Sequence, residues 1–205
     1  MLSARNSGIL GAAIQVIFIT VLIFAAPFAR AVGEGCTPAA HKFCVTSTSD
    51  TTDPGSLRAA ITSANTAGGT NTIGFNIAGS GVHTITLGAQ LPFIDTDLTI
   101  DGFSQPGSVQ NTNAPDQGGL NAQLTIEIVG NAGSGFLYTC CAGVTLRTLT
   151  FQGLALHGCS NVILGQSGTT TPKGKLNVYG CYIGTKVDGT ALATTGNGGT
   201  AVRVG

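Results

Sequence analysis

The most regular feature of this chain is a short apolar–x–apolar triplet that recurs along its length. The triplets begin at Ile73, Leu98, Leu124, Leu149, Leu176 and Val202, so successive starting positions differ by 25, 26, 25, 27 and 26. A second, weaker series runs through Ile85, Leu137 and Ile163, whose positions differ by 52 and 26. Alternating side chains are typical of β-strands, and repeats of this length are typical of solenoids. We therefore predict an all-β fold, a parallel β-helix, because a β-sandwich has no reason for constant spacing.

The register of one coil is left open by two competing spacings. The longer spacing, 27, joins Leu149 to Leu176. The shorter spacing, 22, joins segment 154–159 (LALHGC) to the similar segment 176–181 (LNVYGC). Either length suits a coil of a solenoid. Both registers are therefore kept as predictions.

One amphipathic helix is predicted ahead of the coils. Asp53 is a good N-cap, Pro54 suits the first helical position, and Gly68-Gly69 ends the pattern. The apolar face consists of Leu57, Ala60, Ile61 and Ala64. We expect this helix to cover the open first coil, which would otherwise expose its core and an unpaired strand edge. The alternative is a helix that binds a partner.

The first 31 residues predict an export signal. Residues 9–26 form an uncharged, mostly apolar run, and Ala29-Arg30-Ala31 is the small-x-small pattern of a signal-peptidase site. A retained membrane anchor is the alternative, since an apolar run of about 18 residues can just span a bilayer. We predict a mature chain that starts near Val32 and is secreted or held at the cell surface.

The predicted organisation is a signal peptide over 1–31, an N-terminal segment with the capping helix over 32–70, and β-helix coils over 71–205. The last triplet, Val202–Val204, lies at the end of the chain with no helix or polar cap after it. A bare coil edge can pair with other strands. The expected partners there are further coils of a longer chain or a second chain.

Composition supports the all-β prediction and excludes one class of partner. Charged residues make up 9% of the chain, hydrophobic residues 42%, and glycine occurs 31 times. Many short strands joined by tight turns have this composition. Without residues 1–31, which hold Arg5 and Arg30, seven basic and nine acidic residues remain, a net charge near −2. A nucleic-acid-binding surface is therefore not expected.

The six cysteines fit an exported protein without defining a disulfide framework. Cys36 and Cys44 flank a short stretch before the coils and could close a small loop. The others are Cys140, Cys141, Cys159 and Cys181. Because cysteine is small and apolar, these four are interpreted as packing residues of the coils. None has the spacing of a zinc site.

Three segments together resemble a group of exported bacterial β-helix repeat proteins of the pectin-lyase-like type. Gly55–Ile61 with Ala64-Asn65 is similar to their C-S-L-R-E-A-I…A-N motif, with Gly55 in place of Cys and Ala59 in place of Glu. Leu98–Gly102 with Gln105-Pro106-Gly107 is similar to their L-T-I-D-G-x-x-Q-P-G segment.

The third segment lies near the end of the chain. Tyr182–Thr185, Asp188–Ala191 and Asn197–Gly199 resemble a Y-I-G-T-D-x-x-G-T-A…N-G-G repeat, with Lys186 at the Asp position. The resemblance runs in order from about residue 44 to the end. It implies a right-handed parallel β-helix, exported and often part of a larger surface protein, and no defined activity.

A polysaccharide lyase or hydrolase is the enzyme alternative. Such chemistry needs carboxylates that hold Ca²⁺ beside a basic residue, or two carboxylates across a sugar. The candidates are the acids Asp95, Asp97 and Asp101 and the cations Arg147, Lys173 and Lys175. Alternation places the three acids on one side of a straight strand. However, Asp before Gly after a strand is an ordinary turn residue, and no second acidic cluster exists. Ca²⁺ is expected only under this alternative, and no other cofactor.

The preferred hypothesis is a non-catalytic, adhesin-like scaffold whose columns of Thr, Asn and Ser can bind glycans. Such columns are also expected from solenoid stability alone. Two polar segments, Gly107–Asn121 and Gly165–Lys175, predict projecting loops, where binding residues are common. His83, His157 and Tyr179 are interpreted as packing residues, the last two as neighbours only in the register of the shorter spacing.

Overall fold

The computed structural model describes residues 33–114, 116–130, 135–139, 147–159, 161–165, 175–190 and 202–204, with side chains in all but 135–139, 161–165 and 202–204. The predicted signal peptide therefore lies outside the described residues. So do Cys140, Cys141, Lys173 and Asn197–Gly199. In the part of the chain that is described, no helix is long and apolar enough to cross a membrane.

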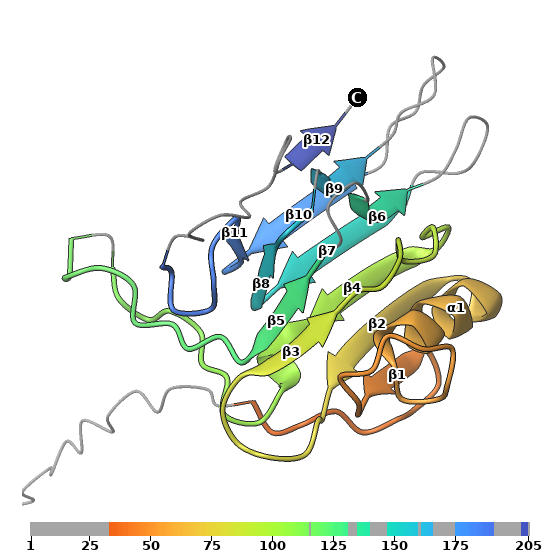
Figure 1. Cartoon of the computed structure of the whole chain (residues 1–205), viewed down its shortest axis with the longest axis horizontal. Coiled ribbons are helices and arrows are strands. Elements are labelled where there is room, and N and C mark those ends of the chain that lie inside the picture. The colour runs from red at the N-terminus through yellow and green to blue at the C-terminus, as the bar shows by residue number, and fades with distance from the viewer. Residues whose placement is uncertain are drawn as a thin grey trace, which may run out of the picture.

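The described strands form a parallel β-solenoid of about four turns (Figure 1). The first sheet stacks β1 (Lys42–Val45), β2 (Thr70–Phe75), β4 (Asp97–Asp101), β7 (Thr148–Gln152) and β10 (Lys175–Tyr179). The second sheet stacks β3 (His83–Thr86), β5 (Ile126–Val129), β8 (Leu154–His157) and β11 (Tyr182–Ile183). The third stacks β6 (Gly135–Thr139), β9 (Asn161–Gly165) and β12 (Val202–Val204). The predicted all-β parallel β-helix is confirmed.

The core consists of apolar columns inside the coils. Side chains alternate along each strand, so in β4 Leu98 and Ile100 point inward while Asp97, Thr99 and Asp101 point outward. Parallel pairing then places like positions above one another, as in the column Ile73, Ile100 and Phe151. One coil cannot bury its apolar side alone, and stacking completes the core.

The helix α1 (Leu57–Ala67) lies beside β1 and β2 at the start of the stack (Figure 1). Its four predicted core residues are all buried, and Gly68 ends it with a positive φ of 61°. The predicted N-cap Asp53 is wrong. Gly55 has a φ of 91°, which interrupts any helical run from Pro54, and Ser56 caps the helix by accepting a hydrogen bond from the Ala59 amide.

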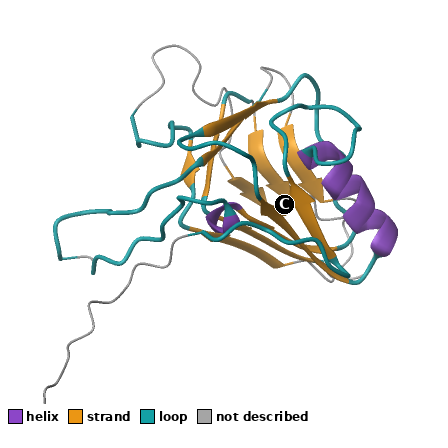
Figure 2. Cartoon of the chain, turned by 90° about the horizontal axis from the view of Figure 1, so that it is seen from below, coloured by secondary structure: helices purple, strands orange, loops and turns teal. Residues whose placement is uncertain are grey.

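The predicted position of Leu124 in the strand series is wrong. Leu98 pairs directly with Leu149, and β5 belongs to the second sheet, where Ile126 pairs with His83. More residues separate β4 from β7 than separate the other neighbouring strands of the first sheet. The additional residues lie in the 3₁₀ turn η1 (Gly102–Ser104) and the predicted loop Gly107–Asn121. That loop extends far from the strands, and Val109 and Gln123 bridge its base (Figure 2).

The remaining registers are partly as predicted. Leu149 pairs with Leu176, which confirms the longer of the two competing spacings, and the shorter one is wrong because Leu154 pairs with Ile126. In the second predicted series, Leu137 pairs with Ile163 in the third sheet. Two strand assignments are corrected: Ile85 lies in the second sheet, and Val202 pairs with Ile163.

Candidate functional site

The outward face of the first sheet carries a central column of hydroxyl and amide groups. Parallel register places Thr72, Thr99, Thr150 and Asn177 directly above one another. All four side chains are half-buried, and Asn177 Nδ2 donates to Thr150 Oγ1 at 3.1 Å. Successive coils of a parallel sheet are about 4.8 Å apart, so the column presents polar groups at that interval.

Two further columns flank the threonines. On one side, Lys175 stacks on Thr148, whose amide donates to Asp97 Oδ1 at 2.6 Å. On the other side lie Asp101, Gln152 and Tyr179, again in register. Tyr179 is 57% exposed, so its interpretation as a packing residue is corrected. The three columns form one polar surface with a single exposed aromatic ring, here called the first-sheet face.

The predicted acids do not form a metal site. Asp97 and Asp101 share the outward side of β4, as alternation predicted, but the length of strand between them separates them by about 13 Å. Asp101 Oδ1 accepts from the Phe103 amide at 3.0 Å and so caps η1. Asp95 is exposed and precedes the strand. Among the described residues, no group of three or more acidic, histidine or cysteine side chains could hold a metal ion.

The predicted cations are only partly brought together. The Lys175 amide donates to the Arg147 carbonyl at 2.8 Å, so the two residues lie on neighbouring coils. Neither side chain forms an ion pair with a described acid; Asp50 pairs with Arg58, and Glu127 Oε1 lies 3.0 Å from His157 Nε2. A base beside clustered carboxylates, as a lyase requires, is therefore not assembled from the described residues.

The second sheet carries a polar cluster that sequence reasoning missed. Glu127 Oε2 accepts from Thr84 Oγ1 at 2.8 Å, and Glu127 Oε1 lies 3.0 Å from His157 Nε2. One carboxylate thus joins three successive coils. Because it lies between the hydroxyl and the imidazole, the imidazole cannot take the threonine proton, as a nucleophilic triad requires. His157 Nδ1 is buried without a hydrogen-bond partner, which favours a packing role over proton transfer to solvent.

The first segment that carries the family resemblance has a structural role. Arg58 binds both carboxylate oxygens of Asp50, at 2.9 and 2.8 Å, and also donates to the carbonyls of Ala89 and Gln90. Asn65 donates to the Phe93 carbonyl. These bonds tie the helix to the first full coil, so the polar side chains of the motif serve the packing of α1.

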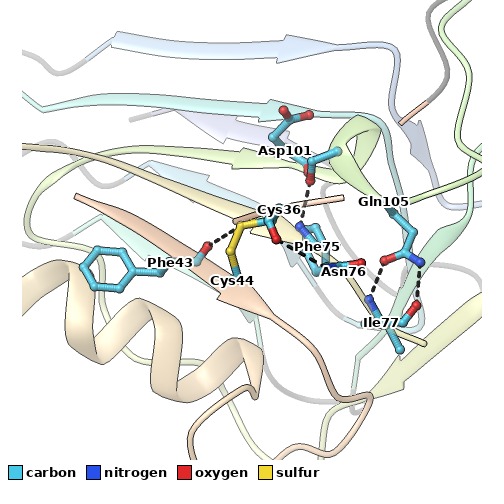
Figure 3. Close-up of a disulfide and its surroundings, with 9 residues drawn as sticks. Cys36, Phe43, Cys44, Phe75, Asn76, Ile77, Asp101 and Gln105 are labelled. Atoms are coloured by element: carbon cyan, nitrogen blue, oxygen red, sulfur yellow. Dashed lines mark hydrogen bonds between the residues drawn. A yellow bond between two sulfur atoms is a disulfide. The ribbon is translucent and has the colours of Figure 1, made fainter. Parts of the chain in front are cut away.

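The second resembling segment is also structural (Figure 3). The Gln105 side chain, fully buried, accepts from the Ile77 amide and donates to the Ile77 carbonyl, both at 2.8 Å. Ser104 Oγ accepts from the Phe75 amide at 2.7 Å. Gly102 packs so closely against the Gly153 carbonyl that a Cβ would not fit. The segment therefore joins neighbouring coils at a corner.

The cysteines provide no nucleophile in the described part of the chain. Cys36 and Cys44 form a disulfide, as their spacing allowed (Figure 3). Burial raises the pKa of the Cys159 thiol to about 12 and also raises the pKa of Cys181. Both thiols are therefore protonated at neutral pH. Because the thiolate is the reactive form of cysteine, neither is expected to act as a nucleophile. The packing interpretation fits these two residues.

One depression lies at the outer side of the helix. It has a volume of about 330 Å³ and lies between β1, α1 and the preceding turn, near Phe43, Pro54 and Ala59. None of its lining side chains is charged, so it offers no acid or base.

Compared with protein-family models, with curated proteins and with solved structures, the chain matches none of them. A function has to be inferred from the chain's own geometry.

Proposed function

We propose that this protein is a non-catalytic, adhesin-like β-solenoid scaffold, exported to the surface or the medium, that binds glycans on its first-sheet face. The observation that carries the proposal is the unbroken run of hydroxyl, amide and carboxylate groups in register on β4, β7 and β10. Sugars are bound by hydrogen bonds from such groups and by contact with an exposed aromatic ring, here Tyr179.

Export is supported by two independent features. The N-terminal segment over 1–31 has the composition of a signal peptide. The Cys36–Cys44 disulfide is of a kind that persists in oxidising compartments and is rare in the cytosol. N-terminal sequencing of protein recovered from the medium or the cell surface tests this proposal, and a start at Val32 is the expected result. An intact Met1 in that material would contradict cleavage.

Glycan binding is tested with a polysaccharide array and purified protein. Tyr179→Ala removes the exposed ring and should weaken binding about tenfold, which corresponds to about 1.4 kcal/mol. Thr150→Ala should weaken it less. The matched control is Thr86→Ala, which removes an exposed hydroxyl from the second sheet and should change nothing. Equal effects of Thr150→Ala and Thr86→Ala would show that the first-sheet face is not the binding surface.

The enzyme alternative is tested in the same experiment. A lyase would release unsaturated oligosaccharides in a Ca²⁺-dependent manner, and a hydrolase would release reducing ends. The expected result is binding without product release. Product formation that is lost in Asp97→Asn or Asp101→Asn would instead establish catalysis on this face.

A further inference from the structure

The corner beside the first-sheet face carries an aromatic ring that lies across two coils. Phe103 is part of η1, and its ring packs against Gly153 and Gly180, the residues that directly follow β7 and β10. A Cβ at Gly153 would lie 2.6 Å from the Phe103 carbon Cγ, and a Cβ at Gly180 would lie 2.8 Å from Cζ. Both positions therefore need glycine. The ring itself is half-buried, so it forms part of the surface at this corner.

One column of the first-sheet face ends at this corner. Asp101, Gln152 and Tyr179 are the last residues of β4, β7 and β10, and they stack in register on the outward side. Asp101 accepts from the Phe103 amide with Oδ1 only, which leaves Oδ2 to accept from a ligand. A carboxylate accepts hydrogen bonds, an amide both donates and accepts, and an aromatic ring offers an apolar surface. A sugar presents the complementary groups, hydroxyls at its edge and C–H bonds on its face.

Charge distinguishes this column from its neighbours. Asp101 is its one charged side chain, whereas the lysines in register with the face, Lys42 and Lys175, belong to the other two columns. In the part of the chain that the structure describes, no lysine or arginine forms an ion pair with Asp101. A sugar carboxylate placed beside Asp101 would be repelled, while a sugar hydroxyl would donate to it. The column is therefore suited to uncharged sugars.

We propose that Asp101, Gln152, Tyr179 and the flanking Phe103, together called the corner subsite, select uncharged oligosaccharides and reject chains that contain uronates. The sugar lies with its C–H face against an aromatic ring, and its hydroxyls bind the Gln152 amide and the Asp101 carboxylate. This inference rests on the proposed function, because it specifies which glycans the first-sheet face takes. It gives Asp101 a role in specificity besides the capping of η1.

Paired neutral and oxidised oligosaccharides test this selection. Each neutral chain on an array is accompanied by the same chain with its C6 hydroxymethyl groups oxidised to carboxylates, and EDTA removes any Ca²⁺ that could bridge two carboxylates. The parent protein should bind the neutral member about tenfold more tightly, because like charges repel. Asp101→Asn, which keeps an oxygen to cap η1, should reduce this preference to about threefold or less. Asp53→Asn removes an exposed acid ahead of α1 and should leave the preference unchanged.

A second variant tests the subsite apart from its charge. Gln152→Ala removes the amide and should weaken binding of the neutral chains about fivefold, with an unchanged circular dichroism spectrum. The matched control Gln117→Ala changes an exposed glutamine of the projecting loop and should have no effect. Unchanged binding by Gln152→Ala would place the sugar elsewhere and overturn the subsite.

The array also separates failure of the selection from failure of the proposed function. If the parent binds oxidised chains as tightly as neutral ones, or if the preference survives in Asp101→Asn, the selection is refuted while glycan binding stands. If the parent binds neither member of any pair, glycan binding itself is refuted, and the selection with it.

Discussion

The first and last described coils each contribute a strand with alternating side chains to the first sheet, but they differ in how they are closed. At the first coil, a disulfide, a capped helix and the Arg58–Asp50 ion pair surround strands whose inward side chains are fully buried, such as Ile73 and Phe75. At the last coil, the corresponding inward positions of β10 are half-buried. The same residue pattern therefore contributes differently to stability according to what covers it, because burial sets the apolar transfer free energy.

The largest effect should separate two leucines of one column. Leu149→Ala removes a side chain that is 2% exposed and should lower the free energy of unfolding by about 3 kcal/mol. Leu176→Ala, stacked directly on it but half-buried, should lower it by about 1 kcal/mol. Urea unfolding followed by circular dichroism measures both. Equal losses would show that the last coil is as well packed as the one beneath it.

The next effect concerns the disulfide of the first coil. Replacing both Cys36 and Cys44 by Ser removes a covalent link across a sequence separation of 8 and should cost about 2 to 3 kcal/mol, since short loops gain least from cross-linking. The same unfolding measurement provides the value. As a control, Cys159→Ala changes a buried thiol outside any disulfide. If the double serine variant is as stable as the parent, the cap does not depend on this link.

A smaller, pH-dependent effect is expected from Asp50. Burial alone would raise its pKa, but hydrogen bonds from Arg58 and from the Gly88 amide lower it overall, below the ordinary value of 3.8. Because the folded pKa lies below the unfolded one, the contribution is complete above the unfolded pKa and is lost as pH falls through the folded value. Asp50→Asn should remove about 2 kcal/mol at pH 7. In the acid range the variant and the parent should converge.

Thermal unfolding between about pH 2 and pH 7, a range that spans the ordinary Asp pKa, checks this prediction. The control is Asp53→Asn, which changes an exposed acid of the same loop. A constant difference between Asp50→Asn and the parent across the whole range would show that the ion pair is not the source of the effect.

Local patterns predicted the elements well, and long-range pairing explains the failures. The helix face and most strand cores follow from periodicity within a few residues. The position of Leu124 was wrong because the loop between β4 and β5 adds nearly one coil length, so that a false repeat with almost the true spacing arises within it. No local signal separates such an insertion from a true coil.

The candidate site was only partly predictable for the same reason. Alternation alone placed Asp97 and Asp101 outward, but their bonds to backbone amides depend on the neighbouring coil and turn. The contact between Glu127 and His157 is diagonal, across strands that pair Val129 with His157. It could be predicted only with the correct register, and the alternative with the shorter spacing paired His157 with the wrong residue.

The smallest effect tests how the helix begins. Ser56 accepts a hydrogen bond from the Ala59 amide at 3.0 Å and donates to the Thr51 carbonyl at 2.6 Å, so Ser56→Ala should cost about 1 kcal/mol. Asp53→Ala, at the N-cap predicted from sequence, should cost less than about 0.5 kcal/mol, because the residue is exposed. Both values come from urea unfolding at neutral pH. A larger loss for Asp53→Ala would mean that the helix begins nearer to Pro54, and that the positive φ of Gly55 does not interrupt it.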